Sequence, residues 1–124
     1  MSDDFERCEM YSVDRTAVDA ARERAPDNAL LARLARTFQA LGETNRLKIL
    51  LSLYEGELCV CELGEVLAMS APAVCHHLRM LKDLGLVRAR RSGKLVYYSL
   101  DDDHIHMLLE TGLAHVEHSF RSKY

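Results

Sequence analysis

Turn-forming residues between positions 69 and 94 restrict the fold of this chain more than any other feature. Ser70 is a good N-cap and Pro72 fits the first turn of a helix, which Gly85 then stops. Ser92-Gly93 provides a short turn between two apolar segments. These signals predict two helices and two strands, at about residues 61–68, 71–84, 86–91 and 95–100. A short helix, a turn, a longer helix and a hairpin, in that order, predict a winged helix-turn-helix.

The remaining segments predict a mainly α-helical fold with one small β-hairpin. Asn28 is expected to cap a helix that Gly42 ends. Further helices are expected at about residues 14–24, 44–54 and 101–119. We therefore expect a partly ordered, polar N-terminal arm at residues 1–27 and a winged helix-turn-helix domain at residues 28–124. This fold is expected to dimerise through its N- and C-terminal helices.

A basic segment lies in an otherwise acidic chain. Residues 70–99 contain six basic side chains and one acidic one, a local charge of +5, although the whole chain has a formal charge of −3. Positive charge releases the counterions condensed on DNA, and small side chains can approach base edges. A solvated basic surface and an ordinary α/β domain with a basic hairpin are the alternatives. The candidate DNA contacts are Ser70, Ala71, Ala73, Val74 and His76 for bases, Arg79 and Lys82 for phosphates, and Arg90, Arg91 and Lys94 in the wing.

The last predicted helix carries candidate metal ligands near both of its ends. Helical spacing places His104, His115 and His118 on one side, but His104 and His115 lie about 16 Å apart along the axis. A zinc ion bonds its ligands at about 2 Å, so one helix cannot bring both ends to one ion. Two antiparallel copies could do so, with Asp102 and His104 of one chain meeting His115 and His118 of the other. The spacing therefore suggests both a metal and a dimer.

An apolar stripe on the same helix is the expected dimer face. It consists of Ile105, Leu108, Leu109, Gly112, Leu113 and Val116. The candidate histidine ligands lie along one border of this stripe, whereas His106 lies on the other border, about 200° from His104. We therefore expect His106 not to bind metal. The alternative is that all four histidines are solvated residues of a helix that only dimerises.

Two cysteines, Cys59 and Cys61, lie at the start of the helix-turn-helix. Thiolates at this spacing can bind one soft metal, and a nearby helix N-terminus favours the thiolate form. The pair is also compatible with packing, because cysteine is a common small core residue. Cys8 in the N-terminal arm is a candidate third ligand, and Cys75 is expected to pack.

Together these segments resemble the ArsR/SmtB family of metal-responsive repressors, and the likeness covers nearly all of residues 28–119. The matching segments are LGETNRLKIL at 41–50, ELCVCEL at 57–63, Ser70 through Arg79, GKLVYYSL at 93–100 and the Asp-x-His…His-x-x-His helix. The resemblance implies a homodimer that binds an imperfect inverted repeat in a promoter while it is metal-free. Metal binding then lowers DNA affinity and releases transcription of metal efflux or sequestration genes.

The resemblance also implies two kinds of metal site. Members with the same C-terminal pattern bind zinc or cobalt between the dimer-interface helices, which maps onto Asp102, His104, His115 and His118. Members with the cysteine box bind cadmium, lead, bismuth or arsenite, which maps onto Cys59 and Cys61. The cadmium- and lead-sensing branch adds cysteines from the arm of the other protomer, which maps onto Cys8. The second arm cysteine of that branch is replaced here by Ser12. This leaves at most three sulfur ligands in the site and disfavours tetrahedral cadmium binding.

We predict a cytoplasmic metal-sensing repressor, with zinc as the first candidate metal and cadmium, lead or cobalt as alternatives. No segment is long and apolar enough to span a membrane, and the acidic N-terminus lacks the features of a signal peptide. In the cytoplasm the four cysteines are expected to be thiols or metal ligands. A repressor that senses arsenite or thiol oxidation through Cys59 and Cys61 is the alternative. An enzyme is not expected, because the sequence has no paired general base, nucleophile motif or Gly-rich phosphate loop.

Overall fold

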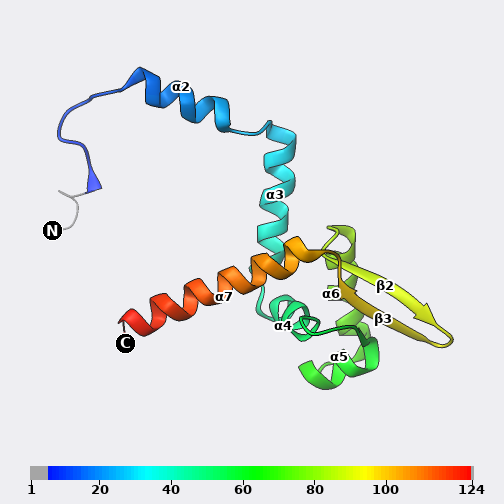
Figure 1. Cartoon of the computed structure of the whole chain (residues 1–124). Helices are drawn as coiled ribbons and strands as arrows, with labels where there is room; N and C mark the ends of the chain where they lie inside the picture. The colour runs from blue at the N-terminus through cyan, green and yellow to red at the C-terminus, as the bar shows by residue number, and fades with distance from the viewer. Residues whose placement is uncertain (1–5, 124) are drawn as a thin grey trace. The chain divides into compact units, whose positions relative to one another are not determined.

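The computed structural model describes residues 6–123, and the side chains of residues 6–121. Helices and a small sheet account for most of these residues (Figure 1). The chain divides into two compact units, Met1–Leu34 and Ala35–Tyr124. The boundary between the units lies inside helix α3 (Asn28–Leu41).

The N-terminal unit contains helix α2 (Arg15–Arg24) and the first half of α3. Asp14 caps α2, because its side chain accepts hydrogen bonds from two backbone N–H groups of the first turn. The helix predicted near residues 14–24 is thus confirmed. The start of α3 differs from the prediction in one detail. The Asp27 carboxylate accepts the N–H of Leu30 at 2.8 Å, so Asp27 caps α3 and Asn28 is its first residue.

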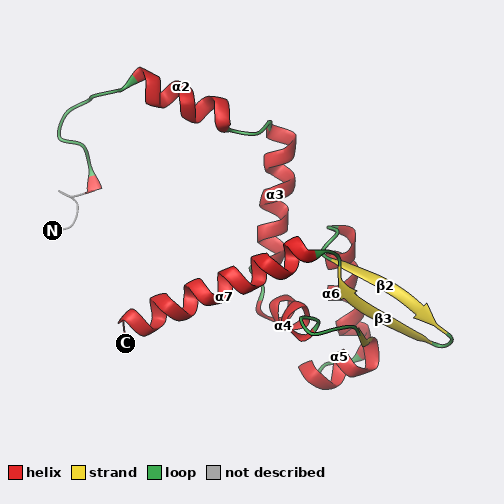
Figure 2. Cartoon of the chain, viewed as in Figure 1, coloured by secondary structure: helices red, strands yellow, loops and turns green. Residues whose placement is uncertain are grey.

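The second unit combines helices with a three-stranded antiparallel sheet. Figure 2 shows the longer strands of this sheet as yellow arrows. After α3 its elements are α4 (Thr44–Ser52), β1 (Leu58–Cys59), α5 (Val60–Leu67), α6 (Ala71–Asp83), β2 (Val87–Ser92), β3 (Leu95–Leu100) and α7 (Asp103–Lys123). The strand order is β1-β3-β2, so β3 is the central strand. The predicted fold, a mainly α winged helix-turn-helix, is confirmed. Strand β1 was not predicted.

Leucine, isoleucine and valine side chains from α4, α5 and α6 form the core of this unit. The fully buried side chains are Ile49, Leu50, Leu63, Val74, Leu78, Leu81 and Leu86. Val87, Leu100 and Leu109 join the same core from β2, β3 and α7. Burying each large apolar side chain stabilises the fold by about 1.5–3 kcal/mol relative to leaving it exposed. The core therefore holds α6 and the β2–β3 hairpin against α4 and α5.

The turn between α5 and α6 is tight. Ala68 adopts a left-handed conformation (φ 54°), and the N–H of Met69 donates to the carbonyl of Gly64 at 3.0 Å. The chain passes so close to Gly64 that a Cβ there would lie 3.1 Å from the carbonyl oxygen of Met69. Ser70 then caps α6, as predicted, by accepting the N–H of Ala73 at 3.3 Å. This turn sets the direction in which α6 leaves α5.

The wing is the hairpin formed by β2 and β3. Ser92 pairs with Leu95, so the two turn residues are Gly93 and Lys94. The predicted turn at Ser92-Gly93 was one residue early. Gly93 has a φ of 61°, which glycine adopts without strain and which suits the first position of a two-residue hairpin turn. The turn therefore places the exposed Lys94 at the tip of the wing.

Helix α7 follows the wing and is partly packed against the core. Leu109 is only 6% exposed, whereas Leu113 and Val116 are 47% and 61% exposed. The inner side of α7 therefore contacts the core near its start, and its apolar side stays open further along. None of the described helices, α7 included, combines the length and apolar character needed to cross a membrane.

Candidate nucleic-acid interface and metal-binding residues

Helix α6 presents most of its predicted DNA-contacting side chains to solvent. The exposed ones are Ser70, Ala71, His76, Arg79 and Lys82, and Ala73 is half-buried. Val74 is 0% exposed and belongs to the core. It lies one turn before Leu78, on the buried face of α6. The predicted contact of Val74 with bases is therefore wrong.

The wing contains three basic side chains that were predicted to contact DNA, and their environments differ in the structure. Arg91 and Lys94 are exposed. Arg90 instead binds Glu57, with Nε donating to Oε2 at 3.2 Å and Nη2 donating to Oε1. The Arg90 guanidinium also lies over the ring of Tyr97, 4.9 Å from its centroid. The hydrogen bond from Arg90 lowers the pKa of Glu57, and Glu57 raises the pKa of Arg90.

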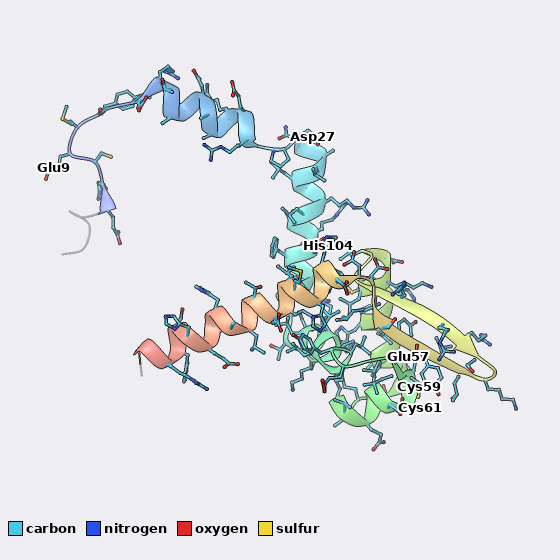
Figure 3. The ribbon with its side chains drawn as sticks, viewed as in Figure 1. Glu9, Asp27, Glu57, Cys59, Cys61 and His104 are labelled. Atoms are coloured by element: carbon cyan, nitrogen blue, oxygen red, sulfur yellow. The ribbon has the colours of Figure 1, made fainter. Side chains whose placement is uncertain are left out.

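The first pair of candidate metal ligands, Asp102 and His104, lies at the start of α7, where Figure 3 labels His104. Asp102 caps the helix, because its Oδ1 accepts the N–H of Ile105 at 3.1 Å. Its other oxygen, Oδ2, lies 3.5 Å from Nδ1 of His104, whose side chain is 90% exposed. The N–H of Ile105 lowers the pKa of Asp102, and His104 lowers it further. Asp102 is therefore a charged carboxylate beside an accessible imidazole.

The second pair, His115 and His118, lies further along α7, and both side chains are exposed. The helical rise of about 1.5 Å per residue separates His104 from His115 by roughly 16 Å and from His118 by roughly 21 Å. Within the described residues, no three His, Cys, Asp or Glu side chains of one chain come close enough to hold a metal ion. Each end of α7 therefore offers two donors, and one chain alone does not complete a four-ligand site.

The remaining histidine of α7, His106, is engaged elsewhere. Its ring stacks on that of Tyr54, with centroids 3.8 Å apart and planes 23° from parallel. The Tyr54 hydroxyl donates to Oε2 of Glu110 at 2.7 Å, and this hydrogen bond raises the pKa of Tyr54. Tyr54 lies just beyond α4, so these contacts tie α7 to the end of α4. Sequence patterns gave no signal for this link, because Tyr54 and Glu110 are 56 residues apart.

The cysteines of the box have unequal environments. Cys59 is 6% exposed at the N-terminus of α5, and its N–H donates to the Glu62 carboxylate at 2.9 Å. Cys61 is exposed on the first turn of α5 (Figure 3). Cys8 is exposed in the other compact unit, and Cys75 is half-buried in α6. All four are free thiols.

The sequence of this chain is similar to those of known bacterial regulators. Residues 43–89 match the family described as "Bacterial regulatory protein, arsR family". A cadmium resistance transcriptional regulatory protein CadC homolog from Staphylococcus aureus is 44% identical over 83% of this chain and 81% of that protein. The chain belongs to the arsR family. The regulator NmtR of Mycobacterium tuberculosis is also 44% identical, over 78% of this chain and 82% of that protein.

Solved structures of two bacterial proteins share the fold. The solution structure of apo-NmtR has a TM-score of 0.64 and 44% identity, and the match covers 76% of this chain and 80% of that one. A homodimeric winged helix-turn-helix DNA-binding domain from Mycobacterium bovis, described as a possible ArsR-family regulator, has a TM-score of 0.73 and 28% identity. That match covers 80% of this chain and 94% of the other. The family assignment inferred from sequence motifs is therefore confirmed.

The donors on α7 fit the metal site that the family resemblance implies. Carboxylate oxygen and imidazole nitrogen are both common ligands of zinc. Asp102 uses one oxygen to cap α7, which leaves Oδ2 facing His104. An aspartate is ionised at neutral pH, and the capping bond lowers the pKa of Asp102 below its ordinary value of 3.8, so the carboxylate needs no deprotonation before it binds a cation.

Proposed function

We propose that the protein is a cytoplasmic metal-sensing repressor, which binds operator DNA as a metal-free homodimer and releases it when metal binds. The operator is an imperfect inverted repeat, and release allows transcription of metal efflux or sequestration genes. The observation that carries this proposal is the distribution of donors on α7. Two exposed pairs, Asp102 with His104 and His115 with His118, lie at separate positions on one helix with an open apolar side.

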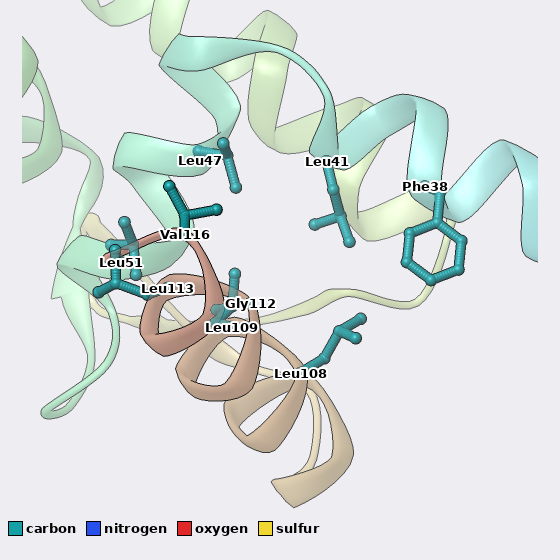
Figure 4. A pocket seen from close by; sticks show the side chains of 9 residues that line it. All are labelled: Phe38, Leu41, Leu47, Leu51, Leu108, Leu109, Gly112, Leu113 and Val116. Atoms are coloured by element: carbon teal, nitrogen blue, oxygen red, sulfur yellow. The ribbon is translucent and has the colours of Figure 1, made fainter. Parts of the chain in front are cut away.

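An apolar groove beside α7 supports the homodimer (Figure 4). It is lined by Phe38, Leu41, Leu47, Leu51, Leu108, Leu109, Gly112, Leu113 and Val116, from α3, α4 and α7. Phe38 is 51% exposed and Val116 is 61% exposed. Large apolar side chains gathered in this way mark an interaction surface. A second copy of the chain, with its own α7 laid antiparallel, would cover the groove and bring opposite donor pairs together.

The metal site formed in such a dimer has four protein ligands. Asp102 and His104 come from one protomer, and His115 and His118 come from the other. A closed set of four ligands is typical of a structural or regulatory zinc site, whereas catalytic zinc keeps an open position. Zinc is our first candidate, with cobalt, cadmium and lead as alternatives. Metal at this site would fix the two α7 helices in one relative position.

The DNA-binding elements are connected to α7 through packed side chains. Leu109 of α7 belongs to the same core cluster as Val74 and Leu78 of α6. The hydrogen bond between Tyr54 and Glu110 ties α7 to α4 as well. A change in the position of α7 can therefore alter the spacing of the two recognition helices. A coupling on the order of 1–3 kcal/mol would change operator affinity from several-fold to a hundredfold.

A DNA-binding titration tests this proposal. The duplex is the promoter upstream of the protein's own gene, and zinc or lead is added to the reduced, metal-free protein. We expect tight binding that zinc abolishes in the wild type and in the His106→Ala control, but not in His104→Ala. Release by zinc that survives His104→Ala would refute the α7 site.

A second candidate function places the sensor at the cysteine box. The observation that favours it is the exposed Cys61 beside Cys59 at the N-terminus of α5, because two thiols at this spacing can bind one soft metal. Capture of arsenite or lead by Cys59 and Cys61, or oxidation of these thiols, would then cause release. Cys8 from the arm of the other protomer is the candidate further metal ligand. The variant Cys59→Ser/Cys61→Ser separates the two functions in the same titration. A zinc response that survives in this variant supports the α7 site, and release by lead alone, lost in the variant, moves the sensor to the cysteines.

A further inference from the structure

The wing contains an ion pair that removes one arginine from the predicted DNA-binding set. We infer that Glu57 holds Arg90 in place of a DNA phosphate and thereby limits the operator affinity of the free protein. This inference rests on the proposed function, because it requires the wing to lie against DNA. It identifies Glu57 as an affinity-determining residue, although Glu57 lies outside both α6 and the wing.

The geometry of the pair resembles the binding of phosphate by arginine. Two nitrogens of the Arg90 guanidinium, Nε and Nη2, each donate to a different oxygen of the Glu57 carboxylate. Arginine binds carboxylates and phosphates through the same two-pronged arrangement of N–H groups. While Glu57 occupies this edge of Arg90, the edge is not available to a phosphate.

The three-stranded sheet brings these two residues together. Arg90 on β2 pairs with Tyr97 on β3, and Tyr97 pairs with Cys59 on β1. Glu57 precedes β1, so it reaches Arg90 from the far side of the central strand. The guanidinium also lies over the ring of Tyr97, 4.9 Å from its centroid. Arg90 is therefore held by a carboxylate and an aromatic ring at the same time.

The pair remains accessible to a large anion. The Arg90 side chain is 55% exposed and that of Glu57 is 39% exposed. An exposed ion pair of this kind contributes little stability by itself, so the fold does not depend on it. Its effect on DNA binding is measurable. Each phosphate that a protein neutralises steepens the slope of log affinity against log salt concentration by about 0.9.

The first experiment compares the salt dependence of operator affinity between the wild type and two variants. Operator affinity is measured between about 50 and 200 mM salt. In Glu57→Gln the freed Arg90 gains a phosphate, so the slope steepens by about 0.9 and affinity at low salt rises roughly threefold to tenfold. The matched control is Glu55→Gln, an exposed acid two residues away, which removes the same charge without freeing Arg90.

The double variant Glu57→Gln/Arg90→Gln decides the cause. If Arg90 makes the new contact, the double variant returns to the wild-type slope. The inference is overturned if Glu57→Gln behaves like Glu55→Gln, or if the gain persists when Arg90 is also removed. The same slopes are also measured on a non-operator duplex, which separates the two proposals. If the wild-type protein binds the operator no better than the non-operator duplex, only the proposed repressor function is contradicted. A wild-type protein that binds neither duplex contradicts both.

Discussion

Val74 tests which face of α6 is buried. Its position near the start of α6 predicts a contact with DNA bases, whereas the structure places its side chain in the core. Val74→Ala removes two buried methyl groups from a side chain that is 0% exposed. The lost transfer free energy is about 1.6 kcal/mol, and the cavity left in the core raises the total to about 2–3 kcal/mol. The folded-to-unfolded ratio should fall roughly 30- to 150-fold.

The assay is urea unfolding of the metal-free protein followed by circular dichroism. Both proteins are compared at one fixed concentration, because the stability of a dimer depends on protein concentration. Operator affinity is then measured at a temperature where both are folded, on duplexes with single base changes. We expect Val74→Ala to keep the wild-type base preference.

The neighbouring exposed residue His76 is the matched control. His76→Ala should change stability by less than about 0.5 kcal/mol, as surface substitutions do, and should alter base preference. The opposite pattern, with unchanged stability and altered base preference in Val74→Ala, would refute the assignment of Val74 to the core.

Single sites give three further predictions. Cys59→Ser should keep the fold and its thermal stability close to wild type, because serine is a favoured N-cap and α5 begins directly after Cys59; a large loss of melting temperature would contradict this. The pKa of the Glu57 carboxyl should lie below the ordinary glutamate value of 4.5, so its stabilising pair with Arg90 is present above pH 4.5 and is lost as the pH falls through the lowered value. An NMR pH titration checks this, and Arg90→Gln should move the midpoint back toward 4.5. Zinc affinity should weaken as the pH falls from about 7.5 to about 5.5, because histidine must lose its proton to bind metal. Calorimetry at the two pH values measures this, and an unchanged affinity would show that the ligands are not histidines.

Local signals were sufficient to predict the order of the helices and the wing. Ser70 and Gly85 act on their own neighbours, through a cap and a chain reversal, so their effect can be inferred without knowing the rest of the fold. The burial of Val74 was also available from the sequence. Val74, Leu78 and Leu81 follow helical spacing, and this pattern outweighs the position of Val74 near the start of α6.

The contacts missed by sequence reasoning join residues that are far apart in the chain. Glu57 and Arg90 are 33 residues apart, and they meet only because β1 adds a third strand to the wing. Strand β1 has two residues, too few for an alternating pattern to be visible. The contact of Tyr54 with Glu110 likewise depends on how α7 crosses the end of α4. Such contacts follow from the packed structure and not from local preference.

The central claim is that α7 donors from two chains form one metal site, and mixed dimers test it most directly. A His104→Ala chain and a His115→Ala chain, each with a different tag, are purified as homodimers and as the mixed dimer. In the mixed dimer one intersubunit site loses both substituted ligands and the other keeps all four. We predict that the mixed dimer binds one zinc ion tightly and that neither homodimer does. A mixed dimer that binds zinc no better than the two homodimers would contradict the intersubunit site.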